Sequence, residues 1–320
     1  MKLRVLECPR CGAPLPRRAA LVRLTCSFCN SEVVVDRFSV KASEYRDRLA
    51  EYLAEPGGAH CVIGKTPIRL LGRVATGHSS DVFLAERATR LSERLIVKRL
   101  RDPGDEALLR NEQHTLGELA RSTQQGASYF TTLLPQRVAF GPLAGDVAAV
   151  FREPVGFTHT LESVAVAHQF ALDPRHAVWL GRRVLELLSF VHRSGFVHAA
   201  VLPPHILIHA SEHGARLVGF SCAARVGAPL ECFDPRFEQL YPEEVLNGRG
   251  VSPRDDLSML ARSLLWAMGQ ASAIPSPLGE FLNELANLDD SGDAWQAQQH
   301  LDRVARQAFG APRFLRLEMP

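Results

Sequence analysis

The chain has 320 residues, 46% of them hydrophobic, which is enough to bury one large domain core with a small module beside it. The formal net charge of +2 excludes a general attraction to nucleic acids or membranes. No secretory apolar segment follows residues 1–4, and no apolar run reaches the roughly 18 residues that span a bilayer. These features predict a globular cytoplasmic protein.

Residues 1–38 carry two C-x2-C pairs separated by fourteen residues: Cys8 with Cys11, and Cys26 with Cys29. In a reducing compartment such pairs are typical of metal ligation, and two pairs can complete a tetrahedral Zn2+ site. The spacing resembles that of a zinc ribbon, in which Glu32–Val35 would be the strand after the second pair. Because so small a module buries little core, bound zinc would supply most of its folding free energy.

This ribbon has two possible roles. Arginines such as Arg17 and Arg18 favour nucleic-acid binding, but residues 1–36 hold six Lys/Arg against three Asp/Glu. Four thiolates around Zn2+ contribute a further charge of about −2, so 6 − 3 − 2 leaves about +1, too little for a basic binding face. A structural or protein-docking role is therefore expected, and two matched pairs are better explained by one metal than by two redox dithiols.

Residues 39–58 predict a helical linker, capped by Ser43 and ended by the Pro-Gly-Gly of residues 56–58. Residues 71–85 then predict two strands joined by a turn. They align on Val82 with G-x-G-x-x-G-x-V, the glycine-rich loop that protein kinases have, and Gly77 is the one glycine that is kept. The Cβ atoms at the other two glycine positions would restrict the approach of phosphates.

Two further segments follow in the order that protein kinases have. Residues 95–98 (Leu-Ile-Val-Lys) resemble the V-A-I-K strand, and residues 109–116 resemble the helix whose glutamate pairs with that lysine. The resemblance implies an ion pair between Lys98 and Glu112. Either Lys98 holds nucleotide phosphates or the pair only fixes the helix to the sheet, and both alternatives stay open. Residues 148–154 would be the last strand and the hinge, where adenine binding leaves no sequence signal.

In the large lobe, a helix predicted over residues 177–193 leads into the layout of the kinase catalytic loop, H-R-D-L-x-x-x-N. His198 keeps the histidine, but Ala200 stands at the catalytic aspartate and His205 at the metal-binding asparagine. Gly219 replaces the aspartate of D-F-G, the principal metal ligand. The resemblance therefore implies that the base and the Mg2+ ligands are lost. His205 could hold a softer divalent ion, but Gly219 supplies no second ligand, so no metal site is expected there.

The activation segment is expected to be inert as well. Residues 222–240 contain no Ser, Thr or Tyr that could accept a phosphate, and Ala199 replaces the arginine that would bind one. Cys222 and Cys232 lie in this segment, and we expect free, half-buried thiols rather than a regulatory disulfide.

The residues that maintain the architecture of the family are kept. His198 should hydrogen-bond backbone inside its loop, and Asp256, near the start of a helix, should tie down the backbone of that loop. Residues 241–243 (Tyr-Pro-Glu) resemble A-P-E. Since residues 291–297 contain no arginine to pair with Glu243, this brace should be rearranged.

Together these motifs predict an α+β, bilobal protein-kinase-like fold behind a zinc ribbon. The predicted parts are the ribbon (1–38), the linker (39–58), the small lobe (59–154), the large lobe (155–312) and a tail (313–320). The expected function is that of a pseudokinase: a catalytically inactive signalling scaffold or regulator that binds protein partners, with structural Zn2+, no Mg2+ and ATP binding left open. The alternatives are an atypical ATP-dependent kinase or other transferase that uses Lys98, and a regulator that binds nucleic acid through the ribbon. The sequence does not indicate the oligomeric state.

Overall fold

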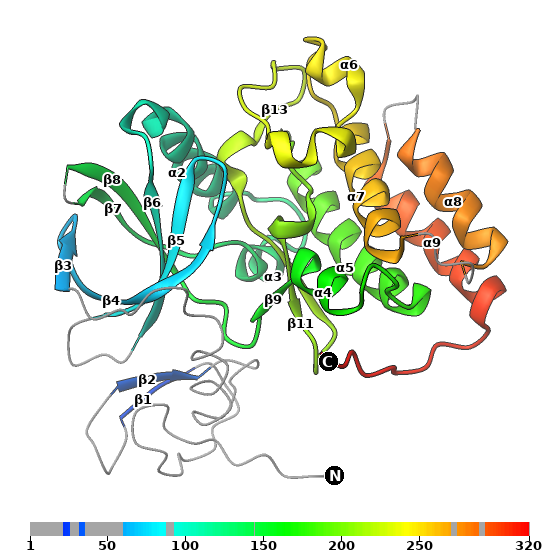
Figure 1. Cartoon of the computed structure of the whole chain (residues 1–320), viewed down its shortest axis with the longest axis horizontal. Coiled ribbons are helices and arrows are strands. Elements are labelled where there is room, and N and C mark those ends of the chain that lie inside the picture. Colours follow the sequence, from blue (N-terminus) through cyan, green and yellow to red (C-terminus); the bar gives the residue numbers. More distant parts are fainter. Residues whose placement is uncertain are drawn as a thin grey trace. The chain divides into compact units, whose positions relative to one another are not determined.

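The structure is a computed structural model that describes residues 22–25, 32–35, 60–87, 93–143, 145–269, 274–287 and 292–319. The chain divides into two compact units, one of Met1–Leu109 with Gln136–Gly156 and one of Arg110–Pro135 with Phe157–Pro320. The first unit is rich in strands and the second is mainly helical (Figure 1).

Unit 1 is built on a six-stranded antiparallel sheet with the strand order β3-β4-β5-β6-β8-β7. The strands are β3 (His60–Ile63), β4 (Thr66–Thr76), β5 (Ser80–Arg87), β6 (Arg94–Leu100), β7 (Arg137–Leu143) and β8 (Asp146–Arg152). Buried and half-exposed residues alternate along β6, as expected for a strand with one face on a core. That core includes Ile63, Ile68, Leu95 and Val97, all fully buried.

The two edge strands of this sheet, β3 and β7, also approach each other. A Cβ on Gly141 of β7 would lie 2.9 Å from the backbone nitrogen of Gly64, closer than Cβ atoms come in real proteins. Glycine at position 141 therefore allows the two edges to meet, and the sheet is strongly curved.

A separate antiparallel pair precedes this sheet in the chain. Strands β1 (Val22–Thr25) and β2 (Glu32–Val35) pair with Thr25 opposite Glu32. The strand predicted at Glu32–Val35 is therefore confirmed. The chain between the two strands carries Cys26 and Cys29, and the four predicted zinc ligands lie outside the described residues, as does the predicted linker helix.

Unit 2 contains most of the helices. They are α2 (Glu106–Ala120, from Arg110 onward in this unit), α3 (Ala127–Phe130), α4 (Leu161–Ala167), α5 (Pro174–Arg193), α6 (Glu243–Leu246), α7 (Pro253–Met268), α8 (Ser276–Ala286) and α9 (Ala294–Phe309). Short strands accompany them: β9 (His159–Thr160), β10 (Phe196–Val197), β11 (Ile206–His209), β12 (Gly214–Leu217) and β13 (Ala224–Arg225). Four 3-10 segments are η2 (Thr131–Leu133), η3 (Pro203–His205), η4 (Phe220–Cys222) and η5 (Pro235–Leu240), and a fifth, η1 (Pro103–Asp105), lies in unit 1.

The central helix of unit 2 is α5, which includes the helix predicted over residues 177–193. It begins where the side chain of Asp173 accepts a hydrogen bond from the backbone N–H of Arg175, with Pro174 at the first helical position. It ends before Gly195, whose φ of +81° turns the chain. Its buried face packs against α7, α9 and β12, so the loop after α5 starts from a rigid support (Figure 1).

The predicted tail packs against unit 2. Leu317 is buried, and the ring of His213 is stacked between Trp179 of α5 and Phe314, with ring centroids 4.4 and 4.2 Å away. Nε2–H of His213 also donates to the backbone carbonyl of Leu315. The C-terminal segment therefore belongs to the folded unit (red in Figure 1). In the part of the chain that the structure describes, no helix is long and apolar enough to cross a bilayer.

Candidate functional site

The loop after α5 is anchored by one carboxylate on α7. Asp256 is fully buried and accepts hydrogen bonds from the backbone N–H groups of His198 and Ala199, both at 2.8 Å. This confirms the role predicted for Asp256. A third donor, Nε2–H of His192 on α5 at 2.8 Å, was not predicted. Ala199 has a φ of +58°, uncommon for a residue with a Cβ atom, and the bonds from Asp256 stabilise this conformation.

His198 is a buried, hydrogen-bonded histidine. Its Nε2–H donates to the carbonyl of Val218 at 3.1 Å, and its ring packs edge-on against Phe220 with centroids 4.4 Å apart. The predicted bond to a backbone carbonyl is present, but the expectation that its acceptor lies inside the loop of His198 is wrong, because Val218 directly precedes Gly219. Burial lowers the pKa of His198, so the imidazole is neutral at physiological pH.

Ala200, His205 and Gly219, where the resemblance implies the base and the metal ligands of a kinase, lie side by side in unit 2. Nδ1–H of His205 donates to the carbonyl of Ala200 at 2.8 Å, which holds the imidazole over Gly219. A Cβ on Gly219 would lie 2.6, 2.7 and 2.8 Å from three atoms of that ring. The side chain of His205 therefore occupies the space in which any side chain at position 219 would begin.

The carboxylate of Asp234 interacts electrostatically with His205, but it is already hydrogen-bonded to another residue. Both carboxylate oxygens of Asp234 accept hydrogen bonds from the guanidinium of Arg236. Burial would raise the pKa of Asp234, but the hydrogen bonds from Arg236 outweigh it and the pKa is lowered. Within the described ranges, no group of three or more His, Cys, Asp or Glu side chains is arranged to hold a metal ion.

Two side chains of helix α2 form hydrogen bonds with the segment after Gly219. The two carboxylate oxygens of Glu112 accept from the backbone N–H of Phe220 at 3.0 Å and from the hydroxyl of Ser221 at 3.3 Å. The side-chain amide of Asn111 donates to the carbonyls of Ser221 at 2.9 Å and Ala223 at 2.7 Å. Glu112 thus has an architectural role inside unit 2, and Asn111 adds a contact that no motif had indicated.

Cys222 and Cys232 form a disulfide, with Cα atoms 5.4 Å apart. The expectation of free thiols is therefore wrong. It considered each cysteine by itself, whereas disulfide pairing depends on whether the fold brings two Cβ atoms together. Here the fold brings Cys222 of η4 next to Cys232 of the loop before η5.

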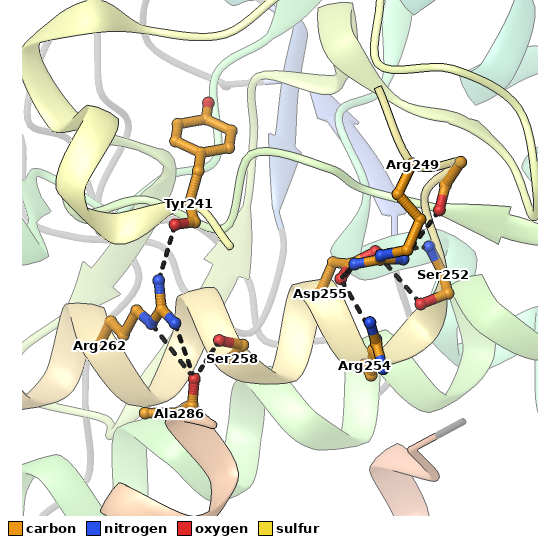
Figure 2. Close-up of polar contacts among 9 residues, drawn as sticks. Tyr241, Arg249, Ser252, Arg254, Asp255, Ser258, Arg262 and Ala286 are labelled. Atoms are coloured by element: carbon orange, nitrogen blue, oxygen red, sulfur yellow. Dashed lines mark hydrogen bonds and ion pairs between the residues drawn. The ribbon is translucent and has the colours of Figure 1, made fainter. Parts of the chain in front are cut away.

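The region around residues 241–243 is held by an arginine of α7 (Figure 2), while the rearrangement predicted for the brace of Glu243 itself stays a prediction. The guanidinium of Arg262 donates to the carbonyl of Tyr241 at 2.6 Å and, through two nitrogens, to the carbonyl of Ala286 at the end of α8. At the start of α7, buried Asp255 accepts from Arg249 and from the backbone N–H of Ser252. Arg262 of α7 and Arg249 of the preceding loop therefore stabilise this region. No local sequence pattern indicates either contact.

The predicted nucleotide-binding residues of unit 1 lie on the sheet and on the turn between β4 and β5. The backbone N–H of Gly77 donates to the carbonyl of Ser80 at 2.7 Å, which closes the turn between β4 and β5. Lys98 lies on β6, opposite Val82 on one side and Ala149 on the other. Lys98 and Glu112 belong to different units, so the ion pair between them stays a prediction.

Comparison with known proteins identifies the fold. The structure is similar to that of vaccinia related kinase 3, with a TM-score of 0.59 and 16% identity over 83% of this chain and 95% of the other. It is also similar to the BubR1 kinase domain, with a TM-score of 0.59 and 13% identity over 83% of this chain and 91% of the other. The chain therefore has a protein-kinase-like fold, with a sheet-rich and a helical unit.

Sequence comparison adds one curated relative. No protein-family model matches the chain. The chain is 31% identical over 108 residues to the STE20-related kinase adapter protein strd-1 of Caenorhabditis elegans, a match over 31% of this chain. The chain spans 28% of the length of that relative.

Proposed function

We propose that this protein is a catalytically inactive, kinase-like scaffold or regulator that binds protein partners. The observation that carries the proposal is the imidazole of His205, whose ring atoms lie 2.6 to 2.8 Å from where a Cβ on Gly219 would be. An aspartate cannot occupy position 219 while His205 keeps its hydrogen bond to Ala200. The two replacements therefore complement each other sterically, as expected for a site rebuilt without Mg2+.

The donors at this site do not suit magnesium. Mg2+ prefers six oxygen ligands in octahedral geometry, usually with one or two carboxylates. Here the three key positions supply a methyl group, an imidazole and a glycine, and the oxygens of Asp234 are bonded to Arg236. Loss of a general base alone commonly lowers a rate by about 10² to 10⁴. These features support an inactive site.

The architecture around the site is kept, which favours a binding role over simple decay. The contacts of Asp256, His198 and Glu112 still hold the loop and the segment after Gly219 in one conformation. The name of the relative, a kinase adapter protein, is consistent with a kinase-like fold that acts through partners.

Label transfer from ATP tests the proposal directly. The full-length protein, its Lys98→Ala variant and an active kinase are incubated with labelled ATP, a general protein substrate and either Mg2+ or Mn2+. We expect wild type and Lys98→Ala to give the same background. Transfer by wild type that Lys98→Ala abolishes would refute inactivity.

Isolation of stoichiometric protein partners from the native host tests the scaffold role, which fails if the chain purifies alone.

We further propose that Cys8, Cys11, Cys26 and Cys29 bind one structural Zn2+ and that this ribbon is a second docking module. The spacing of the four thiolates supports this proposal. The purified protein should contain one zinc per chain by elemental analysis, and Cys26→Ser should lower that content. Cys61→Ser is the matched control, since Cys61 is a free cysteine on β3. Equal zinc content in the two variants would refute the site.

A further inference from the structure

The disulfide between Cys222 and Cys232 joins two segments that are held in different ways. Cys222 is the last residue of η4, and its neighbours on both sides are hydrogen-bonded to Asn111 of α2. Glu112 of α2 holds the same stretch through the backbone N–H of Phe220. Cys222 therefore lies in a backbone that α2 clamps from both sides.

The chain after Cys222 stays well bonded for six residues. β13 (Ala224–Arg225) pairs with β10. The backbone N–H of Gly227 donates to the carbonyl of Val251 at 2.7 Å, and Val251 N–H donates to Ala228 at 2.8 Å. Up to Ala228, the backbone has fixed partners in the rest of unit 2.

The stretch from residue 229 to residue 233 has far fewer contacts. Among the residues that the structure describes, no backbone hydrogen bond reaches this stretch. Leu230 packs against the small apolar cluster that includes Val251, and the ring of Phe233 lies edge-on to Tyr241 with centroids 5.9 Å apart. Residues 229, 231 and 233 are exposed. The covalent bond from Cys232 is therefore the strongest restraint on this stretch.

We propose that Cys222 and Cys232 are a reversible thiol–disulfide modification site that pins residues 229–233 when oxidised and releases them when reduced. Neither cysteine is fully buried, so a small thiol or a protein dithiol can reach the sulfurs. Residues 222–240 contain no hydroxyl side chain that could be phosphorylated, so the cysteine pair is the chemistry available for a covalent switch here. The inference does not depend on whether the site at Ala200 is inactive.

The reaction is thiol–disulfide exchange with a dithiol. One thiolate of the reductant attacks a sulfur of the pair, which forms a mixed disulfide and releases the other cysteine as a thiolate that takes up a proton. The second thiol of the reductant then displaces the remaining cysteine. In sum, the Cys222–Cys232 bond gains two electrons and two protons, and the dithiol becomes a disulfide. Glutathione disulfide drives the reverse reaction and leaves as two molecules of glutathione.

Redox titration and hydrogen exchange together test the proposal. The full-length protein is equilibrated in buffers of reduced and oxidised glutathione, alkylated, and analysed peptide by peptide for free Cys222 and Cys232. We expect one two-electron transition of the pair. The two cysteines are 10 residues apart, and closing a loop of this size restrains the chain by on the order of 10²-fold. The amides of Gly227 and Asp234, which are hydrogen-bonded on either side of residues 229–233, should therefore exchange up to about a hundredfold faster after reduction, with α7 unchanged.

The double variant Cys222→Ser/Cys232→Ser provides the control for the other cysteines. Its Gly227 and Asp234 amides should exchange at the fast rate with or without reductant, whereas Cys61→Ser should behave as wild type. The proposal is overturned if the pair stays reduced at every glutathione ratio. It is also overturned if oxidised and reduced wild type exchange equally, or if the double variant still responds to reductant.

Discussion

The contact between Gly219 and His205 yields a quantitative prediction for Gly219→Ala. The new Cβ would lie 2.6 Å from Cδ2 of His205, and the ring cannot move away without losing its bond to Ala200. Such overpacking costs about 1 to 3 kcal/mol. The φ of +81° at position 219 adds the cost of a left-handed alanine, about 1 to 2 kcal/mol. We expect the free energy of unfolding of unit 2 to fall by about 2 to 5 kcal/mol, the sum of these two costs.

Two further variants separate the costs. Gly227 has a φ of +84°, and apart from its two chain neighbours no described residue has a heavy atom within 4 Å of the position that a Cβ would take there. Gly227→Ala should therefore lower the free energy of unfolding only by the cost of a left-handed alanine, about 1 to 2 kcal/mol. In a His205→Ala background the steric part should vanish, so Gly219→Ala should also cost only about 1 to 2 kcal/mol there. The double-mutant cycle then measures a coupling of about 1 to 3 kcal/mol.

Urea denaturation followed by tryptophan fluorescence measures these changes. All three tryptophans, Trp179, Trp266 and Trp295, belong to unit 2, so the signal reports the unit that contains Gly219. The reasoning would be refuted if Gly219→Ala cost no more than Gly227→Ala, or if its cost were unchanged in the His205→Ala background.

Three other predictions use the same assay. Asp256→Asn should lower the free energy of unfolding by about 2 to 4 kcal/mol, because one amide oxygen cannot accept from three buried donors. Burial lowers the pKa of His176 to about 4, below its ordinary value of about 6.5. The unfolded chain therefore binds more protons between these values, and stability should fall as the pH drops from about 6.5 to about 4. His176→Gln, which can still accept from Trp179, should weaken that dependence. Arg262→Lys should cost about 1 to 2 kcal/mol, because lysine cannot reach the carbonyls of Tyr241 and Ala286 together.

Each of these predictions has its own contrary result. A stability loss below about 0.5 kcal/mol for Asp256→Asn, the range of an ordinary surface substitution, would mean that the three bonds do not hold the loop. An unchanged pH dependence in His176→Gln would assign the acid sensitivity to other groups. A stability loss below about 0.5 kcal/mol for Arg262→Lys would contradict the brace.

Much of the site could be predicted because its residues occur in a fixed order. The place of Asp256 in the helix after residues 241–243 indicates its role, and its hydrogen bonds to the loop are those expected. The helix predicted over residues 177–193 is also present within α5, since a buried stripe at helical spacing is visible locally. The contacts of Glu112 with Phe220 and Ser221 were not predicted, because these donors are reached only by folding α2 onto a segment more than a hundred residues away.

By itself the sequence determined which chemical groups stand at each position of a kinase-like framework: a methyl group at Ala200, an imidazole at His205 and no side chain at Gly219. These identities are written residue by residue and need no coordinates. Only the tertiary structure decided that the imidazole of His205 fills the space over Gly219 and that Cys222 pairs with Cys232. Both depend on distances of a few ångströms between segments that separate elements bring together, and such distances leave no periodicity or spacing in the chain.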